Sequence, residues 1–308
     1  MYKQFIWYPL LTLLTLGFTH CKKTATPLIA NFHFYDSMQL DGYERSYLLN
    51  LPPTYNDSSN FPLVIALHGL AGSASQMEQD YGLTTKSNSA GFIVVYPEGV
   101  RSDGFLGIRT WNAGTCCDFA MERNVDDVHF ISQLIQKLTS TYKINPKKIY
   151  VTGMSNGAMM TYRLACELSP QLAAIAPVSG TLLTTNPCTP ARAVPVLHIH
   201  SAIDNKVPYA GGYGLANYYF PPVDSTLRVW ACIDGCHATP QVITQANLYT
   251  QTQYMNCNPN TTVQLYLTKD GGHSWPGGLP ARAGADAPSA AFNATDLIWS
   301  FFNQYQLP

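Results

Sequence analysis

The sequence predicts an α/β fold in which a mostly parallel central sheet carries helices on both faces. Short, continuous apolar runs recur along the chain, and such a run is typical of a strand buried on both faces. Helical patterns stand between the runs, and this alternation favours a parallel sheet covered on both sides. The runs are residues 62–67, 91–96, 149–151, 173–178, 194–199 and 263–267, of which the last is expected to close the set.

The composition is that of a large globular domain with few charges. Of 308 residues, 46% are hydrophobic and only 12% are charged, and the formal net charge is -1. This balance excludes a disordered chain and offers no basic surface for nucleic acid, so no nucleic-acid partner is expected. We expect residues 31–308 to form a single catalytic domain around one large core.

The first 20 residues differ from the rest and read as a secretion signal. Lys3 precedes an apolar stretch at 5–16 that is too short for a confident membrane span. Cys21 follows directly, in the place of the lipid-acceptor cysteine of a bacterial lipoprotein, but His20 stands before it where a small residue is usual. We therefore expect an exported protein with a tether at 21–30. It would be extracellular, periplasmic or held at the cell envelope, touching a membrane only through a lipid anchor at Cys21.

The next element is predicted to be a β-hairpin. Extended runs at 31–39 and 44–51 flank Asp41-Gly42, a dipeptide typical of tight hairpin turns. Two later stretches, 101–123 and 209–222, fit neither a strand nor a helix pattern and are rich in Gly, Tyr and Trp. We interpret both as loops at the rim of a functional site.

Two long helices are predicted from their apolar stripes. Residues 127–142 bring apolar side chains onto one face, and Asp126 and Asp127 stand at the positive end of that helix. Residues 291–305 carry a second stripe and form the last predicted helix.

A pentapeptide supplies the first chemical signal. Gly153-Met154-Ser155-Asn156-Gly157 directly follows an apolar run and precedes a helical segment at 158–166. A strand, then Gly-x-Ser-x-Gly, then a helix is the context of a nucleophile elbow, in which a strained turn holds the serine hydroxyl out of the sheet. Ser155 is the predicted nucleophile.

A reactive serine requires a base and a carboxylate to orient that base. In α/β-hydrolases they follow in the order serine, acid, histidine, each after a strand. Asp204 follows the 194–199 run and is the predicted acid, ahead of Asp224, which reads as a helix-start residue. His273 stands in a glycine-rich loop after the last run and is the predicted base. His198 and His200 are expected to pack within their strand.

Acyl transfer also requires donors for the developing oxyanion. The loop after the 62–67 run reads His68-Gly69-Leu70. We expect the backbone N–H groups of Leu70 and Asn156 to be the donors, since Asn156 follows the nucleophile. His68 then holds the loop and does not act as a base.

Eight cysteines in an exported chain indicate disulfides. Without Cys21, seven remain, so at least one must be a free thiol. They lack paired C-x-x-C spacing, and no metal site is expected. The seven are Cys116, Cys117, Cys166, Cys188, Cys232, Cys236 and Cys257.

At these residues the chain resembles the family of exported esterases that includes polyhydroxybutyrate depolymerases, feruloyl esterases and acetylxylan esterases. The matching pieces lie between about Phe34 and Phe302: Leu67-His68-Gly69, Trp111-Asn112-Ala113-Gly114, Cys116-Cys117, Asn124 to Val128, the Ser155 pentapeptide, Asp204 to Tyr209, and Gly271 to Gly277. The resemblance implies an α/β-hydrolase fold, an acyl-serine mechanism and no cofactor.

The resemblance also implies a disulfide between Cys236 and Cys257, which brackets the strand before His273. The other cysteines stay unpaired by resemblance alone, and a link of Cys116 or Cys117 to Cys188 stays open. The chain departs from the family at Ser201-Ala202-Ile203, where Gly-Thr-Ala is usual, and at His129, where Gly is usual. The first change adjoins Asp204.

The expected function is a secreted serine carboxylic ester hydrolase that acts on hydroxycinnamoyl or acetyl esters of plant polysaccharide. A polyhydroxybutyrate depolymerase is the alternative, and either substrate would be polymeric or polymer-derived. The candidate substrate-binding residues are His68, Trp111, Tyr209 and Trp275. Trp111 and Trp275, with Tyr209, Tyr213, Tyr218 and Tyr219, are candidates to line an aromatic cleft for either ligand, and the alternative is that half of them pack the rim. A peptidase ranks lower because no gating domain is apparent, and a non-catalytic binding protein ranks lower because every required group is present.

Overall fold

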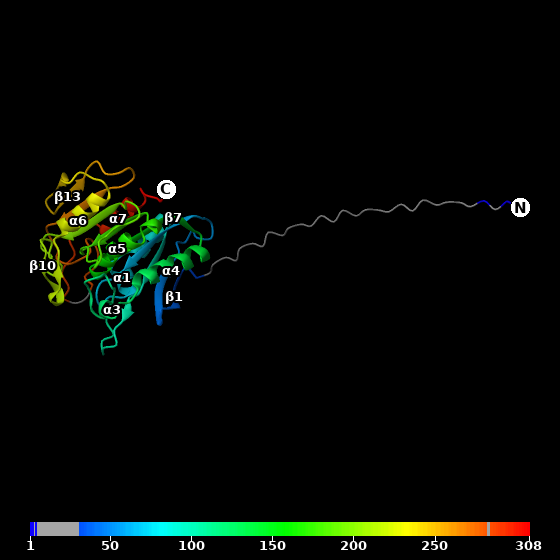
Figure 1. Ribbon diagram of the computed structural model, residues 1–308, viewed down its shortest axis with the longest axis horizontal. Coiled ribbons are helices and arrows are strands. Elements are labelled where there is room, and N and C mark those ends of the chain that lie inside the picture. Colours follow the sequence, from blue (N-terminus) through cyan, green and yellow to red (C-terminus); the bar gives the residue numbers. More distant parts are fainter. Residues whose placement is uncertain (3, 5–30, 282–283) are drawn as a thin grey trace. The chain divides into compact units, whose positions relative to one another are not determined.

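The computed structural model describes residues 1–2, 4, 31–281 and 284–308 (Figure 1). The predicted secretion signal and tether, with Cys21, lie outside the described residues apart from Met1, Tyr2 and Gln4. Asn31–Pro308 forms one unit by its internal contacts. In the part of the chain that the structure describes, no helix has the length and apolar character required to cross a membrane.

A ten-stranded sheet is the centre of this unit, in the order β1-β2-β4-β3-β7-β8-β9-β14-β13-β12. Strands β4, β3, β7, β8, β9 and β14 are parallel, and the pairs at both edges are antiparallel. The bounds are β1 (His33–Leu40), β2 (Tyr43–Asn50), β3 (Phe61–Leu67), β4 (Ile93–Pro97), β7 (Ile144–Met154), β8 (Ala174–Val178), β9 (Val196–Ser201), β12 (Gln241–Gln245), β13 (Tyr249–Tyr254) and β14 (Val263–Thr268). The predicted parallel sheet is confirmed, and its six apolar runs are the six parallel strands.

Residues 263–267 form β14, which is the last strand along the chain, as expected, but β14 is not the edge of the sheet. Strands β13 and β12 continue it beyond β14 as antiparallel neighbours. Their sequences, YTQTQY and QVITQ, are polar and mostly exposed or half-buried. An edge pair of this kind carries no continuous apolar run, so the pattern that revealed the central strands is absent here.

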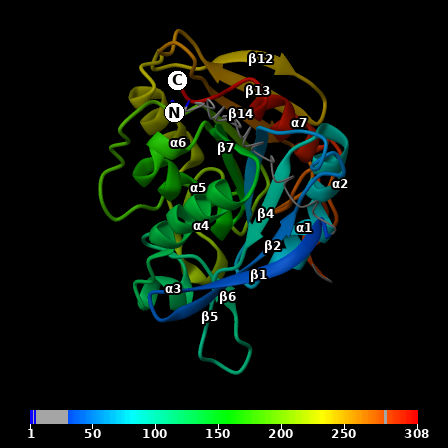
Figure 2. The same cartoon turned by 90° about the vertical axis from the view of Figure 1, so that its right-hand side faces the viewer.

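Helices cover both faces of the sheet. Figure 2 shows α4 and α5 on one side and α1, α2 and α7 on the other. The bounds are α1 (Ala74–Tyr81), α2 (Leu83–Ala90), α3 (Asp118–Glu122), α4 (Asp127–Thr141), α5 (Asn156–Glu167), α6 (Val223–Ile233) and α7 (Ala294–Phe302). Asp126 stands at the start of α4, as predicted, and it also caps the helix, because its carboxylate accepts a hydrogen bond from the N–H of His129.

The predicted hairpin and rim loops are present. Asp41 (φ 52°) and Gly42 (φ 81°) both adopt positive φ, the requirement of a two-residue turn between twisted strands. The two rim stretches are mostly irregular. They contain the short elements β5 (Val100–Arg101), β6 (Arg109–Thr110), α3, β10 (Gly212–Tyr213), η2 (Leu215–Asn217) and β11 (Tyr219–Phe220).

Disulfides pair six of the described cysteines. The bonds are Cys116–Cys117, Cys166–Cys188 and Cys236–Cys257, and Cys232 on α6 is a free, exposed thiol. The pair implied by resemblance is therefore present. Cys188 bonds to Cys166 on α5, so the open alternative of a link to Cys116 or Cys117 does not form.

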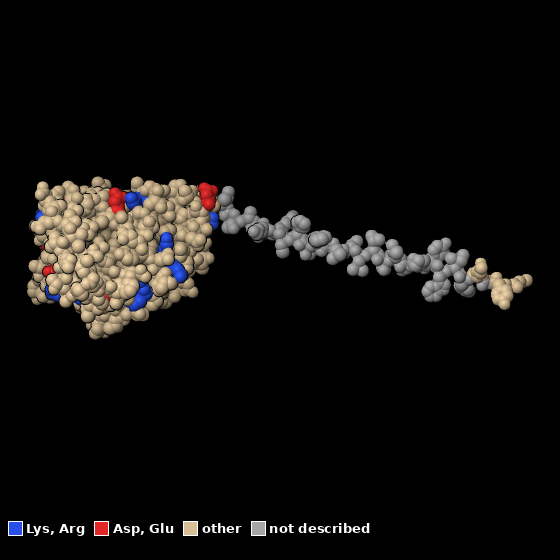
Figure 3. Space-filling view, turned by 90° about the horizontal axis from the view of Figure 1, so that it is seen from above, with Lys and Arg blue, Asp and Glu red and all other residues tan. Residues whose placement is uncertain are grey.

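Charges are sparse on the surface of this unit. On the face shown in Figure 3, lysine, arginine and acidic side chains are scattered among uncharged ones. The candidate site residues lie where the parallel strands end. The loops that follow β3, β7, β9 and β14 all leave the sheet at the same edge, which brings His68, Ser155, Asp204 and His273 together.

Candidate active site

Ser155 lies in a tight turn, the predicted elbow, between β7 and α5. Its backbone has φ 57° and ψ -120°, a combination that costs an L-residue energy. A Cβ atom at Gly153 would lie 2.4 Å from the Gly157 oxygen, and one at Gly157 would lie 2.3 Å from the Leu67 oxygen. Both glycines of the pentapeptide are therefore required by the close approach of neighbouring backbone.

The three predicted triad residues meet in one hydrogen-bonded line. His273 Nε2 lies 2.7 Å from Ser155 Oγ, and His273 Nδ1 lies 2.7 Å from Asp204 Oδ2. Because a carboxylate only accepts, Nδ1 carries the proton, and Nε2 of the neutral ring is free to accept one from the serine hydroxyl. The order β7, β9, β14 places each residue at the end of its own strand.

Asp204 is buried and fully satisfied. Its Oδ1 accepts the N–H groups of Lys206 and Val207, both at 2.9 Å. Burial by itself raises the pKa of Asp204, but the hydrogen bond from His273, its charge and the backbone donors outweigh burial and lower that pKa. The carboxylate stays ionised and ready to stabilise a charged imidazole.

A second carboxylate holds the loop of His273. Asp286 Oδ2 accepts the backbone N–H of His273 at 2.7 Å, and a Cβ at Gly272 would collide with that same oxygen at 2.4 Å. Ser201 Oγ donates to the Gly271 oxygen at 2.6 Å. Sequence reasoning missed Asp286, because it follows His273 by 13 residues in a segment without any motif.

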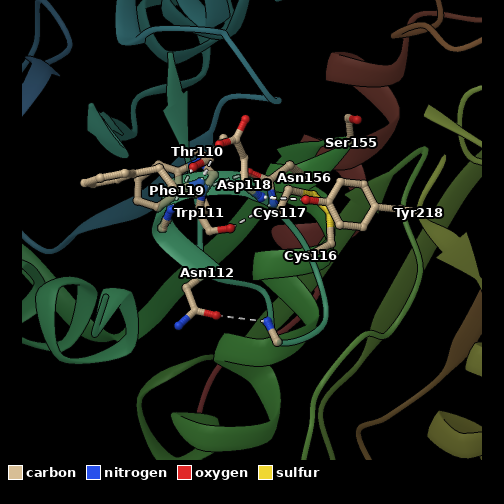
Figure 4. Close-up of a disulfide and its surroundings, with 12 residues drawn as sticks. Thr110, Trp111, Asn112, Cys116, Cys117, Asp118, Phe119, Ser155, Asn156 and Tyr218 are labelled. Atoms are coloured by element: carbon tan, nitrogen blue, oxygen red, sulfur yellow. Dashed lines mark hydrogen bonds between the residues drawn. A yellow bond between two sulfur atoms is a disulfide. The ribbon is translucent and has the colours of Figure 1, made fainter. Parts of the chain in front are cut away.

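On the other side of Ser155, the two expected oxyanion donors are held by neighbouring groups. The side chain of Asn156 is bonded twice to the backbone of Trp111: Oδ1 accepts its N–H at 2.7 Å, and Nδ2 donates to its oxygen at 3.0 Å (Figure 4). Within the described residues, the backbone N–H groups of Leu70 and Asn156 donate to no other group. Both amides are therefore free for a ligand.

His68 fixes the peptide that carries the Leu70 N–H. Its Nε2 accepts the Gly99 N–H at 3.0 Å, so Nδ1 carries the proton and donates to the Gly69 oxygen at 2.7 Å. Burial lowers the pKa of His68 to about 4, and the ring is neutral. Since C=O and N–H of a trans peptide point in opposite directions, holding the Gly69 carbonyl aims the Leu70 N–H away from His68.

Trp111 links the two donors. Its indole N–H donates to the His68 oxygen at 2.9 Å, while its backbone clamps Asn156. The loop behind it folds onto itself, because Ala113 N–H donates to the Cys116 oxygen and Cys117 N–H to the Trp111 oxygen. Figure 4 shows the Cys116–Cys117 bond beside Asn156 and Tyr218.

Of the four candidate substrate-binding residues, Trp275 alone lines the cavity beside Ser155. His68 and Trp111 are completely buried and offer no surface to a ligand. The hydroxyl of Tyr209 donates to Asp224 at 2.6 Å, and its ring does not line the cavity beside Ser155. Trp275 does line that cavity, although it is 1% exposed and stacks on Tyr81 at 4.7 Å. These rings were predicted from residue type alone, which does not distinguish a core ring from a rim ring.

A cavity of about 150 Å³ opens beside Ser155 and His273. Its walls mix apolar and polar side chains, including Leu70, Gln76, Tyr81, Met154, Lys206, Leu215, Trp275, Leu279 and Asp286. A cavity of about this volume holds one benzene-sized ring. Among the described residues, no cluster of three or more His, Cys, Asp or Glu side chains is arranged to bind a metal ion.

Curated relatives are similar over most of this chain. Feruloyl esterase B of Piromyces equi is 29% identical over 272 residues, covering 86% of this chain and 46% of that protein. The bifunctional acetylxylan esterase/xylanase XynS20E of Neocallimastix patriciarum is 28% identical over 251 residues, covering 81% of this chain and 32% of that protein. The chain thus spans less than half the length of these two relatives.

Solved structures share the fold. The acetyl xylan esterase from Aspergillus awamori superposes with a TM-score of 0.61 at 18% identity, covering 88% of this chain and 99% of that one. The esterase PE8 superposes with a TM-score of 0.53 at 16% identity, covering 83% and 96%. These likenesses, with the parallel sheet, make the fold that of an α/β-hydrolase. The model of the esterase PHB depolymerase family matches residues 45–208, more than half of the 308 residues, and the chain belongs to this family.

Proposed function

We propose that this protein is a serine-dependent carboxylic ester hydrolase that works through an acyl intermediate on Ser155. The observation that carries the proposal is the position of His273, whose two ring nitrogens lie 2.7 Å from Ser155 Oγ and 2.7 Å from Asp204 Oδ2. A base that contacts both the serine hydroxyl and a buried carboxylate raises the reactivity of the serine.

In the first half of the reaction, Ser155 Oγ attacks the ester carbonyl and its proton moves to His273 Nε2. Asp204 stabilises the resulting imidazolium. The carbonyl oxygen becomes an oxyanion, which accepts hydrogen bonds from the free N–H groups of Leu70 and Asn156. When the tetrahedral intermediate collapses, the ester C–O bond breaks and His273 returns the proton to the departing alcohol.

The second half repeats these steps with water. His273 accepts a proton from a water molecule, and the hydroxide adds to the acyl carbon of Ser155. The Ser155 Oγ–acyl bond then breaks, the proton returns to Ser155, and the acid leaves. The same pair of amides stabilises both intermediates, since the carbonyl oxygen occupies the same place in each.

For the substrate, we propose hydroxycinnamoyl or acetyl esters of plant polysaccharide. Two relatives carry feruloyl esterase and acetylxylan esterase in their names, which supports this class. The cavity beside Ser155, of about 150 Å³, suits a single aromatic ring or a smaller acyl group. The family's own description, PHB depolymerase, favours polyhydroxybutyrate as the second candidate.

For location, we propose export directed by residues 1–20, with residues 31–308 as the catalytic domain. Three disulfides in the described chain support an oxidising compartment. Lipidation at Cys21 would add a membrane anchor to an otherwise water-exposed enzyme. Mass spectrometry of the secreted protein would identify the mature amino terminus and any lipid on it.

The test compares wild type with Ser155→Ala on p-nitrophenyl acetate, methyl ferulate, acetylated xylan and polyhydroxybutyrate. Wild type should cleave the small esters, and Ser155→Ala should lose that activity while melting near the wild-type temperature. Activity of the variant within about tenfold of wild type would reject Ser155 as the nucleophile. The ranking of the two polymers decides between the substrate classes.

A further inference from the structure

Three buried polar side chains form a row behind the triad carboxylate, and the proposed reaction uses none of them directly. Tyr162 on α5 and His198 and His200 on β9 are at most 1% exposed. Tyr162 Oη lies 2.8 Å from His198 Nδ1, and His198 Nε2 lies 3.1 Å from His200 Nδ1. His200 Nε2 ends the row 2.8 Å from the Val207 oxygen. Burying polar groups is unfavourable for folding, so we expect these three side chains to have a role other than packing.

The end of the row fixes every proton in it. The Val207 oxygen can only accept, so His200 Nε2 must carry a hydrogen. His200 Nδ1 of a neutral ring then accepts from His198 Nε2–H, and His198 Nδ1 accepts from the Tyr162 hydroxyl. All four ring nitrogens are satisfied with both rings neutral. Burial lowers the pKa of both histidines and raises that of Tyr162, which keeps the three groups uncharged.

The row reaches the triad at its last atom. His200 Nε2 lies 3.5 Å from Asp204 Oδ2, the oxygen that also accepts His273 Nδ1–H, and neither side chain is exposed. The ionisable groups that face His200 are Asp204, His273 and His198, with the ring of Tyr209 at 6.0 Å. Because Val207 also donates its N–H to Asp204 Oδ1, the carboxylate and the His200 N–H are held by the same short loop.

We propose that His200 is a positioning residue. Its Nε2–H donates to the Val207 oxygen and lies beside Asp204 Oδ2, and His198 and Tyr162 lock the ring in that tautomer. The inference rests on the proposed serine mechanism. An N–H beside the carboxylate offsets part of its charge, so removing that N–H should strengthen the attraction between Asp204 and a protonated His273. The N–H also resists rotation of the carboxylate away from His273.

Two matched variants separate this role from packing. His200→Gln keeps an N–H donor near the place of Nε2, and His200→Asn keeps a polar group near Nδ1 but none at Asp204. For His200→Asn we expect kcat/KM to fall about fivefold and the acid limb of its pH profile to move up by about half a pH unit, because a weak electrostatic contact with the carboxylate is lost. His200→Gln should keep the wild-type limb.

Controls keep the result independent of folding and of the proposed function. Titration with a serine-directed fluorophosphonate gives the active fraction, and failure of wild type to react would reject the serine mechanism itself. Tyr150→Phe, which removes a buried hydroxyl bonded to the Tyr305 oxygen at 2.6 Å, should lower stability without moving the limb. Equal limbs in His200→Asn, His200→Gln and wild type would overturn the proposal.

A measurement on the unmodified protein covers the case in which His200→Asn does not fold. In protein labelled with ¹⁵N-histidine, the two-bond ¹⁵N–¹H couplings should report Nε2–H tautomers for both His198 and His200. Because burial lowers the pKa of both rings, both should stay neutral at a pH where an exposed histidine is protonated. An Nδ1–H tautomer at His200 would point its donor away from Asp204 and overturn the proposal.

Discussion

The two sides of Ser155 are held in different ways. On the oxyanion side, the supporting groups grip backbone: His68 bonds to Gly69 and Gly99, and Asn156 bonds twice to Trp111. On the acid–base side, the contacts run from side chain to side chain, from Ser155 through His273 to Asp204, with a row of neutral side chains behind it.

The difference follows from what each side does. An amide N–H has a fixed charge distribution, so the oxyanion side requires only that two peptides stay in place. In the proposed reaction, the acid–base side takes up a proton and releases it in each half-reaction, so its partners would have to tolerate a changing charge. Each side also contains a buried neutral histidine bonded to a backbone oxygen, His68 to Gly69 and His200 to Val207.

The largest effect is expected on the acid–base side. Asp204→Asn removes the charge that stabilises the imidazolium and allows the wrong tautomer of His273, so kcat should fall about 10⁴-fold. Steady-state kinetics on p-nitrophenyl acetate measures this loss. Asp224→Asn is the matched control, since Asp224 was the alternative acid and instead bonds to Tyr209. A large loss in Asp224→Asn with little in Asp204→Asn would reverse the assignment.

A smaller effect is expected on the oxyanion side. Asn156→Ala keeps the backbone N–H but releases it from Trp111, so kcat should fall about 10- to 100-fold with KM little changed. Trp111→Phe keeps the backbone clamp and loses only the indole bond to the His68 oxygen. It should therefore lose less. If the two variants lose activity equally, the clamp on Asn156 is not what places the donor.

The smallest effect concerns stability and pH. Burial lowers the pKa of His68 to about 4, below the 6.5 of an unfolded histidine, so the unfolded chain binds this proton first. The stability supplied by neutral His68 is complete above pH 6.5 and is lost as the pH falls toward 4. Between pH 6 and 5 this loss is about 1 kcal/mol. The free energy of unfolding, measured with urea at pH 6 and pH 5, should fall by about 1 kcal/mol less in His68→Gln than in wild type. An equal fall in both proteins would contradict the neutral, buried ring.

Sequence patterns predicted the parts of the molecule that obey strict local rules. Each of the six parallel strands is a continuous apolar run in the sequence. The elbow has a recognisable pentapeptide because a Cβ at Gly153 or Gly157 would collide with neighbouring backbone. His273 was placed by its glycine-rich loop. By contrast, the Cys166–Cys188 pairing depends on which loops lie side by side, and no local pattern encodes that.

The sequence predicted the burial of the two histidines behind Asp204 but not their contact with it. His198 and His200 alternate with Ile199, so both point to one face of a strand. Packing within the strand was predicted from this position, and burial bears it out. The contact with Asp204 was not predicted, because it depends on the turn after β9. Asp286 was missed for a similar reason, since its loop reaches His273 only in three dimensions.

The backbone of Ser155 has a consequence for the durability of the enzyme. At φ 57° an L-residue is strained by about 1–3 kcal/mol, whereas glycine adopts this conformation freely. The molecule therefore gives up some thermal stability at the position of the proposed nucleophile. A Ser155→Gly variant would lose the hydroxyl but relieve the backbone strain, so stability and the proposed chemistry make opposite demands on this turn.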